Sequence, residues 1–227
     1  MEVSKHLNLR EVYEAQNLAR ITNYIHQKAS NTPLTLEIIT FLHQMLLGNI
    51  SDPIAGRFRK PGEYVRVGTH IAPKPELVES MLQAAFNEYD GKLEQYFLDK
   101  ISRFHLEFET IHPFNDGNGR IGRTIINWQL LRLGFPQIII RSKGKEKYYE
   151  TFGIYRIKKT VHPLLTILYR ALTESLHKRL CYLNGRQIIT ISDFAKTLNK
   201  PAPVLLNSAK RQLIPAFREK GIWKIGI

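Results

Sequence analysis

Residues 111–123 read IHPFNDGNGRIGR and separate two segments in which apolar residues recur every three or four positions. This spacing places the apolar side chains of each segment on one helical face. The first helix is expected from Leu93 towards Ile111, and the second from about Arg120 to Gly134, where a glycine and then a proline end the pattern. The sequence therefore predicts two amphipathic helices joined by a loop rich in glycine and charge.

The same periodicity indicates further helices, and the expected fold class is mainly α. The segments concerned are Leu9–Ile25, Leu36–Leu47, Glu76–Tyr89, Lys145–Lys158 and Pro163–Leu183. Between the second and third of these, Glu63–Val67 alternates with the period of two that is typical of an exposed strand. Prolines and glycines on either side break helices, so we expect a β-hairpin or flap there.

The final segment, residues 184–227, has a different pattern from the rest of the chain. A strand, two helices and a second strand are expected at residues 188–191, 192–198, 204–217 and 222–227. This order fits a small winged-helix-like α/β module or a plain C-terminal subdomain. We therefore divide the chain into a helical domain, residues 1–183, and a small basic module, residues 184–227.

The charge of the chain is concentrated near its C-terminal end. The 227 residues include 33 Lys and Arg against 20 Asp and Glu, which gives a net charge of +13. Residues 177–227 hold ten of the basic residues and two of the acidic ones. Such a segment favours polyanions such as nucleic acid, or an acidic protein, although a solvated surface has the same composition. DNA is therefore a candidate partner of the C-terminal module.

Composition also excludes some classes of protein. Cys181 is the only cysteine, so no disulfide can form within the chain and redox chemistry is not expected. No apolar run reaches the ~18 residues that a membrane span needs, and the N-terminal residues do not form the apolar core of a signal peptide. We expect a cytoplasmic protein with no membrane partner.

The glycines of the loop predict an anion site. Gly117 and Gly119 can adopt a positive φ, which would leave successive N–H groups pointing into one concavity at the start of the next helix. Such an arrangement binds phosphate. Arg120 and Arg123 lie in the first helical turn, where the helix dipole disfavours cations unless an anion is bound. Because arginine grips phosphate oxygens in pairs, two of them suit a diphosphate or triphosphate.

Two further residues of the loop suggest what happens to the phosphate. Asp116 would repel phosphate unless a Mg²⁺ ion lies between them, so a divalent metal is implied. His112 has an ordinary pKa near 6.5 and could accept a proton from a hydroxyl group that attacks phosphorus. Each residue alone is more often structural, but their occurrence together favours phosphate chemistry.

The segment His112–Arg123 matches in full the motif His-Pro-Phe-x-Asp/Glu-Gly-Asn-Gly-Arg-x-x-Arg, and on this basis the chain resembles the Fic family. Further similarity is found at Gly56–Arg59, Val65–Pro73, Ile138–Arg141 and Lys147–Tyr149, and the resemblance covers roughly Asn8 to Leu176. It implies a helical core with a β-hairpin flap. It also implies a protein adenylyltransferase, which moves AMP from ATP to a Tyr, Thr or Ser hydroxyl of a target protein.

The resemblance implies a role for each motif residue. His112 would deprotonate the acceptor hydroxyl, and Asp116 would hold Mg²⁺ against the phosphates of ATP, the co-substrate. The nucleotide phosphates would be bound by Gly117, Asn118, Gly119, Arg120 and Arg123.

The resemblance also implies functional roles for residues outside the motif, where the sequence match is less specific. The flap residues Val67, Gly68, Thr69 and His70 would pin the target protein by strand addition, a mode that the alternating pattern also permits. Tyr148 and Tyr149 resemble positions near the nucleoside, although core aromatics on a helix would have the same spacing. Family members often have an asparagine one or two turns further on, where this chain has Arg156, so base selectivity stays open.

Three alternatives to AMP transfer remain at this point. The same phosphate site could transfer UMP, GMP or phosphocholine, or could remove AMP from a modified protein. The chain could instead be a DNA-binding regulator that uses its basic C-terminal module. A homodimer is a further candidate assembly.

Overall fold

The computed structural model describes residues 9–91, 94–141 and 145–227. These residues form two compact units. The first comprises the chain up to Phe135 together with Glu146–Val161, and we call it the motif unit because it contains residues 111–123. The second comprises Pro136–Lys145 and His162–Ile227, and we call it the basic unit.

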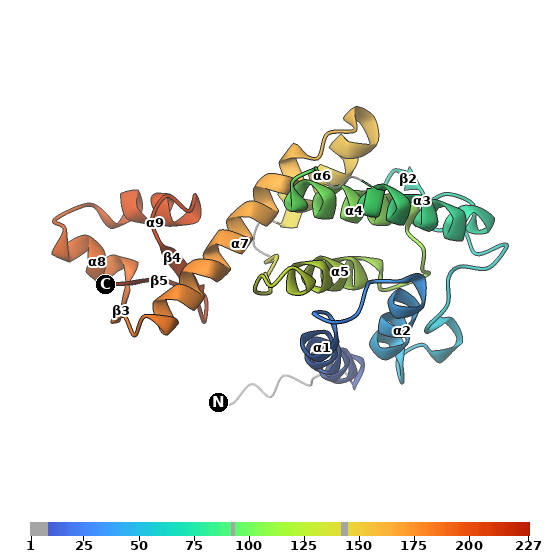
Figure 1. Cartoon of the computed structure of the whole chain (residues 1–227), viewed down its shortest axis with the longest axis horizontal. Coiled ribbons are helices and arrows are strands. Elements are labelled where there is room, and N and C mark those ends of the chain that lie inside the picture. Colours follow the sequence, from blue (N-terminus) through green and yellow to red (C-terminus); the bar gives the residue numbers. More distant parts are fainter. Residues whose placement is uncertain (1–8, 92–93, 142–144) are drawn as a thin grey trace, which may run out of the picture. The chain divides into compact units, whose positions relative to one another are not determined.

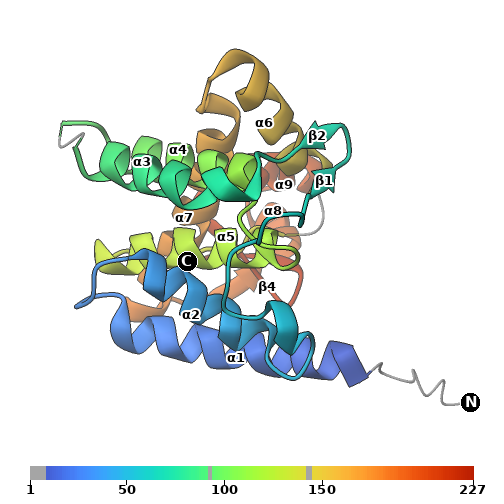
Figure 2. The same cartoon turned by 90° about the vertical axis from the view of Figure 1, so that its right-hand side faces the viewer.

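The motif unit is built from helices and one short hairpin. Its elements are α1 (Leu9–Lys28), α2 (Leu36–Leu47), the 3₁₀ turns η1 (Asp52–Ile54) and η2 (Pro75–Leu77), the strands β1 (Arg66–Val67) and β2 (His70–Ile71), α3 (Val78–Gly91), α4 (Phe97–Ile111), α5 (Asn118–Arg132) and α6 (Lys145–Lys158). Helix α5 lies between α3 and α4 on one side and α1 and α2 on the other (Figures 1 and 2). This central position explains why α5 is apolar on more than one face.

The core of the motif unit forms where α5 meets its neighbours. Ile121, Ile125 and Trp128 of α5 are at most 1% exposed and belong to one cluster with Phe104 and Phe108 of α4. The spacing of these residues is the helical periodicity visible in the sequence. The mainly α fold class is therefore confirmed.

Several predicted boundaries agree with the structure and others do not. Helices α2 and α6 have the expected bounds. Helix α5 begins at Asn118, not near Arg120, because Gly117 takes a left-handed conformation with φ 83° and ends the loop earlier. Helix α4 begins at Phe97, and the expected start at Leu93 falls outside the described residues.

The flap strand is shorter than predicted. The expected strand was Glu63–Val67, but β1 contains only Arg66 and Val67. The Glu63 carboxylate accepts hydrogen bonds from the Arg57 guanidinium at 2.7 and 2.8 Å and from the Lys60 N–H at 2.7 Å. These bonds close a turn at residues 60–63, so that the chain is extended only beyond it.

The basic unit is a small α/β structure. It contains α7 (His162–Leu183), β3 (Ile188–Thr190), α8 (Ile191–Thr197), α9 (Ala202–Lys210), β4 (Ala216–Glu219) and β5 (Ile222–Gly226). The strands form an antiparallel sheet in the order β3-β5-β4. The order α7, β3, α8, α9 and then the β4–β5 hairpin is similar to that of a winged helix; the strand β4 was not predicted, because it lies within the expected helix 204–217.

Helix α9 of the basic unit is shorter than predicted. It was expected to run to Phe217 but ends at Lys210, and Phe217 lies in β4 with no exposed surface. Gln212 has a φ of 56°, which no helix accommodates, and Pro215 follows. Ala216 and Phe217 are buried because they belong to strand β4 rather than to a helical face.

Among the described residues, no helix combines the length and the apolarity that crossing a membrane requires.

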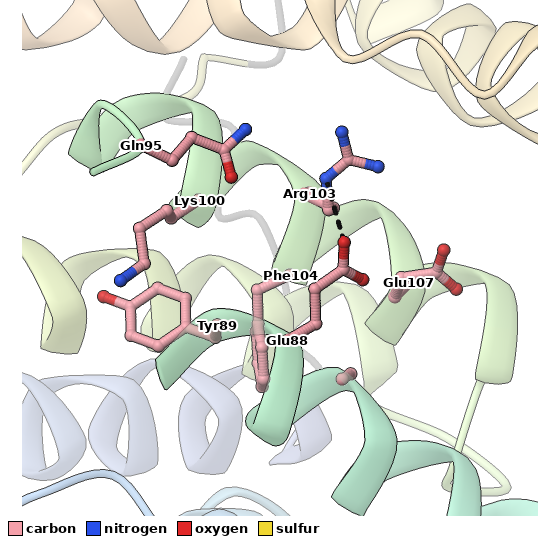
Figure 3. A pocket seen from close by; sticks show the side chains of 8 residues that line it. Glu88, Tyr89, Gln95, Lys100, Arg103, Phe104 and Glu107 are labelled. Carbon is pink, nitrogen blue, oxygen red and sulfur yellow. Dashed lines mark ion pairs between the residues drawn. The ribbon is translucent and has the colours of Figure 1, made fainter. Parts of the chain in front are cut away.

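Figure 3 shows a hollow between α3 and α4. In it, Arg103 pairs with Glu88 at 3.5 Å, and the Lys100 ammonium lies 4.8 Å from the Tyr89 ring centre. Its cavity is about 10 Å³, room for one water molecule, so it is not a ligand site.

The packing of α4 against α5 generates a first prediction. A Cβ atom at Gly122 would lie 2.8 Å from the His105 ring and 2.9 Å from the Glu109 carboxylate, and both side chains are buried. We expect Gly122→Ala to lower the free energy of unfolding by about 1–3 kcal/mol, because neither neighbour has room to move. Urea unfolding followed by circular dichroism measures the change.

Gly153→Ala is the matched control. Gly153 lies inside α6, and a Cβ atom there would meet nothing within 4 Å. Alanine should raise stability there by up to about 1 kcal/mol, since it has the higher helix propensity. Equal effects of the two substitutions would contradict the close approach of α4 and α5.

Candidate active site

His112 ends helix α4 in a left-handed conformation, with φ 51° and ψ 63°. Histidine adopts this conformation more readily than most residues, and the Pro113 that follows it cannot donate a further helical hydrogen bond. The His112 N–H donates to the Phe108 carbonyl at 2.9 Å, which closes the last turn. The side chain is 15% exposed, so the ring is close to the surface of the motif unit.

The His112 ring is uncharged at physiological pH. Burial lowers its pKa to about 4, and the positive charges of Arg59 and Arg156 act in the same direction. Ring atom Nδ1 lies 3.3 Å from the Glu109 carbonyl oxygen. A neutral ring that donates its Nδ1 proton to this carbonyl carries its lone pair on Nε2, where it can accept a proton.

Arg59 fixes the backbone beside His112. This side chain donates to the carbonyl oxygens of His112 at 2.8 Å, Glu63 at 3.1 Å, Pro73 at 2.9 Å and Ile111 at 3.3 Å. Arg59 is only 4% exposed, and its burial lowers the pKa of the guanidinium. One buried cation therefore joins the end of α4 to the segments on both sides of the flap.

His43 of α2 supports the loop from another direction. Its Nδ1 accepts the Gly56 N–H at 3.1 Å, so its Nε2–H donates to the Asp116 carbonyl at 3.0 Å. The ring also stacks on Phe114, with 3.7 Å between ring centres and an angle of 8°. Burial lowers the pKa of His43 to about 4, and the neutral ring is the form that makes both hydrogen bonds.

Sequence reasoning missed Arg59 and His43. Arg59 lies in the Gly56–Arg59 segment, which carried a signal only as a point of family similarity. His43 stands alone on an apolar helix and carries no signal, because its partners are 13 and 73 residues away in the chain.

Asn118 and Gly117 shape the start of α5. The Asn118 Oδ1 accepts the Phe114 N–H at 2.9 Å, and its Nδ2 donates to the Phe114 carbonyl at 2.7 Å. Phe114 has no exposed surface. The Asn118 side chain is thus a clamp on the loop, and its contribution to anion binding rests with its backbone N–H.

The first turn of α5 presents free N–H groups. The N–H groups of Arg120 and Ile121 both donate to the Gly117 carbonyl at 3.0 Å, and that of Gly117 donates to the Asp116 carboxylate at 2.6 Å. The N–H groups of Asn118 and Gly119 have no acceptor within the described ranges. A helix start with free N–H groups is a site for an anion.

The predicted left-handed conformation of Gly119 is wrong. Gly119 lies inside α5, because the helix starts one residue earlier, at Asn118. Glycine is needed here because it has no side chain: a Cβ atom at this position would lie 3.3 Å from Nη1 of Arg123 and 3.7 Å from Oε1 of Glu109. Gly119 therefore leaves room for the Arg123 guanidinium beside the helix start.

Four charged side chains form a closed ring beside this helix start. Arg10 and Glu14 of α1 contact each other at 3.0 Å, and Glu14 contacts Arg120 at 3.0 Å. Arg120 contacts Asp116 at 3.0 Å, and Asp116 contacts Arg10 at 3.0 Å. Partial burial opposes ionisation of Asp116, but Arg120, the Gly117 N–H and Arg10 outweigh it, so the pKa of Asp116 is lowered. The carboxylate is ionised at physiological pH.

The carboxylate of Asp116 fits a Mg²⁺ ion that arrives with phosphate. Within the described part of the chain, no group of three or more His, Cys, Asp and Glu side chains could hold a metal by itself. Mg²⁺ characteristically binds through one or two carboxylates together with water and substrate phosphates. A single ionised carboxylate beside an anion site is such a donor set.

The remaining predicted residues lie in different surroundings. Val67 is 47% exposed, Thr69 is exposed at the tip of the flap and Gly68 has a φ of 59°. His70 joins the flap to α4 through a hydrogen bond of 2.8 Å between its Nε2 and the Thr110 carbonyl. The flap is therefore anchored two residues before His112.

The two tyrosines of α6 differ from each other. Tyr148 is 2% exposed, and its hydroxyl lies 2.6 Å from Nε2 of the buried His105. Tyr149 is 45% exposed. Tyr148 thus belongs to the buried interior behind the motif, and only Tyr149 presents a ring to solvent.

Comparisons with known proteins agree with these features. Residues 33–130 match the Fic/DOC family. "Protein adenylyltransferase Fic" of Nematostella vectensis is 35% identical over 136 residues, which cover 59% of this chain and 31% of that protein. The chain thus spans less than a third of the length of this curated relative.

Two solved structures share the fold. A Fic domain containing signaling protein from Bacteroides thetaiotaomicron superposes with a TM-score of 0.68 at 24% identity, over 77% of this chain and 73% of that one. A Fic family protein from Desulfovibrio desulfuricans G20 superposes with a TM-score of 0.62 at 22% identity, over 97% of this chain and 76% of that one.

The complete motif at residues 112–123, its position between α4 and α5 and the family match over residues 33–130 lead to one conclusion. Residues 33–130 of this chain are similar in sequence to the Fic/DOC family.

Proposed function

We propose that the chain transfers AMP from Mg-ATP to a Tyr, Thr or Ser hydroxyl of a target protein, with His112 as general base. The observation that carries this proposal is the uncharged His112 ring next to a helix start with free N–H groups. A base beside a phosphate site is what activation of a hydroxyl for attack on phosphorus requires. The adenylyltransferase name of the Nematostella vectensis relative supports the choice of AMP.

The transfer moves one proton and exchanges one bond to phosphorus. His112 Nε2 takes the proton from the acceptor hydroxyl, whose oxygen forms a bond to the α-phosphorus of ATP. The bond between that phosphorus and the leaving pyrophosphate breaks. The N–H groups of Asn118 and Gly119, with Arg120 and Arg123, bind the phosphate oxygens and stabilise the charge that develops on them, which is usually the largest contribution to such catalysis.

Asp116 would hold the Mg²⁺ that accompanies ATP. The ion supplies neutralisation of phosphate charge when bound. Arg10 contacts the same carboxylate at 3.0 Å, so the cation competes with Arg10 for Asp116.

The flap would hold the target protein. Val67 and Ile71 are 47% and 63% exposed, and β1 and β2 pair only with each other within the described residues. An extended segment of the target could add to a free edge of this hairpin and bring its hydroxyl to His112. The His70 contact with Thr110 keeps the hairpin close to the end of α4.

Removing the base generates the central prediction. We expect His112→Ala to abolish labelling of target protein by α-³²P-ATP, a loss of roughly 10²- to 10⁴-fold, while Mg-ATP binding stays nearly unchanged. The rate is measured with purified chain, Mg²⁺ and cell lysate, and binding by calorimetry.

His112→Asn is the matched variant, because asparagine tolerates the left-handed backbone that alanine strains. Both variants should lose activity to the same extent. Full activity of either one would contradict the role of His112 as base. If UTP or GTP labels the target protein and ATP does not, the reaction is still nucleotidyl transfer but with a different nucleotide donor. Release of AMP from a modified protein would identify the reverse reaction.

Competition at Asp116 generates a second prediction. Arg10→Gln removes a cation from Asp116, so the Mg²⁺ concentration needed for half-maximal binding of an ATP analogue should fall about two- to fivefold. Arg20→Gln, an exposed arginine on the same helix, changes the net charge equally and should have no effect. A higher Mg²⁺ requirement in Arg10→Gln would mean that the ring organises Asp116 instead of competing with the metal.

The basic unit supports DNA binding as a second candidate function. The elements of the unit are arranged as in a winged helix (Figure 1). Its helix α9 exposes Val204, Asn207 and Lys210 on one face. These residue types can contact a thymine methyl group, an adenine edge and a phosphate, respectively. Seven basic side chains of the unit form no ion pair within the described residues: Arg170, Arg179, Arg186, Lys200, Lys210, Arg211 and Lys220.

Salt dependence tests this candidate. The full chain should bind duplex DNA with an affinity that falls steeply with salt, and Lys210→Gln with Arg211→Gln should reduce the slope by about 1.8, the contribution of two phosphate contacts. His112→Ala and Arg20→Gln should leave the slope unchanged. Fluorescence anisotropy with a labelled duplex measures it, and an unchanged slope in the double variant would exclude α9 as the DNA-binding element.

A further inference from the structure

Glu109 is a buried carboxyl group that the proposed transfer does not use. It lies in α4 one turn before His112 and is 4% exposed. Its Oε1 atom has no hydrogen-bond partner within the described ranges. Burying a carboxyl group without full hydrogen bonding is expensive, and an apolar residue would fill the same space at less cost. Such a group points to a role other than stability.

The surroundings of Glu109 leave room for the carboxyl group and direct it. Gly122 of α5 would place a Cβ atom only 2.9 Å from Oε1, so glycine at this position makes space for the acid. Glu109 Oε1 also lies 4.0 Å from Nε2 of His105 on the same helix. That nitrogen is already hydrogen-bonded to the Tyr148 hydroxyl.

The other carboxylate oxygen approaches the base. Glu109 Oε2 lies 3.7 Å from Nδ1 of His112, the ring nitrogen that also faces the Glu109 carbonyl. Both acceptors lie at the Nδ1 side of the ring. Nδ1 of the base is thus directed towards Glu109, and Nε2 remains for the substrate.

Charged and titratable groups surround this pair from every neighbouring element. Burial raises the pKa of Glu109 to about 7, although the positive charges of Arg123 on α5 and Arg156 on α6 oppose the shift. Burial lowers the pKa of His112, to about 4. The groups that face the pair are His105, Arg123, Tyr148 and Arg156 at Glu109, and Arg59, His70 and Arg156 at His112.

We propose that Glu109 is a positioning residue for His112: its carboxylate keeps the ring proton on Nδ1 and stabilises the imidazolium that forms when Nε2 accepts the hydroxyl proton. The inference rests on the proposed AMP transfer, in which His112 is the base. The proton from the acceptor hydroxyl stays on Nε2 until it passes to water, and Glu109 remains ionised throughout. An opposite charge within about 4–6 Å raises the basicity of an imidazole by about 1–3 pKa units.

The role predicts the direction of the pH dependence. Because the folded-state pKa of Glu109 is raised to about 7, the carboxylate is present above that pH and lost below it. The labelling rate should therefore rise with pH through about 7, although the His112 ring is already neutral there.

Glu109→Gln tests the inference with the full chain. It keeps the size of the side chain but removes the charge and adds an N–H donor that can face Nδ1. We expect the labelling rate at about pH 8 to fall at least about tenfold, the rise through about pH 7 to disappear, and Mg-ATP binding to stay within about threefold. Glu107→Gln is the matched control, since Glu107 lies on the same helix and interacts with Tyr155 and Lys159 instead.

The tautomer of His112 gives a readout that does not depend on activity. In ¹⁵N spectra near neutral pH, the ring proton should lie on Nδ1 in the wild-type chain and on Nε2 in Glu109→Gln, with His112 assigned by the signal lost in His112→Asn. An unchanged tautomer with an unchanged pH profile would overturn the proposal. The proposal would also be overturned if Glu109→Gln lowered only the melting temperature and the affinity for ATP. A changed tautomer in a chain that labels no protein from any nucleotide would leave Glu109 as the positioning residue and reject AMP transfer.

Discussion

Helices α4 and α5 are joined by residues 112–117 alone, and both helices are buried where the loop begins and ends. Within this short connection, His112 adopts the left-handed conformation that ends α4, and Gly117 adopts the left-handed conformation that precedes α5. The base and the free N–H groups are consequently brought to the same short loop. The Asn118 clamp on Phe114 prevents the loop from relaxing into a longer helix at either end.

Two buried ionisable side chains hold the side of the loop that carries the base. Among the described residues, Arg59 has no carboxylate within hydrogen-bonding distance and instead donates to four carbonyl oxygens, which are the acceptors that a loop and a helix end leave free. In the same part of the chain, Glu109 has no arginine within salt-bridge distance, and it lies against the His112 ring. Both side chains are costly to bury, and both act on His112, one through its backbone and one through its ring. The energetic cost is thus concentrated at His112, the base of the proposed transfer.

The sequence was sufficient to predict what depends on local pattern. Helical periodicity gave α2 and α6 to the residue, and the order of elements in residues 184–227 gave the small α/β module. The spacing of His112, Asp116, Arg120 and Arg123 predicted one candidate site because these residues are close in the chain. Sequence reasoning failed where a specific side-chain or strand pairing overrides the repeat: Arg57 binds the Glu63 carboxylate and shortens the flap strand, and Phe217 pairs with Lys224 in a hairpin. Arg59, His43 and Arg10 reach the site from 53, 73 and 106 positions away in the chain, and no local pattern marks them or Glu14.

The site thus has two halves that differ in how easily they can change. On the base side, Arg59 and Glu109 are each 4% exposed, and moving either would uncover or strand a buried charge. On the phosphate side, Glu14 presents to Arg120 the charge that a phosphate would present, and Arg10 presents to Asp116 the charge that Mg²⁺ would present. These side chains are 19% to 54% exposed, and exposed ion pairs contribute little net stability. Replacing the α1 partners of Arg120 and Asp116 therefore costs little free energy, whereas displacing the His112 ring costs much more. In the proposed transfer, the nucleotide and its metal would replace these partners while His112 stays in place.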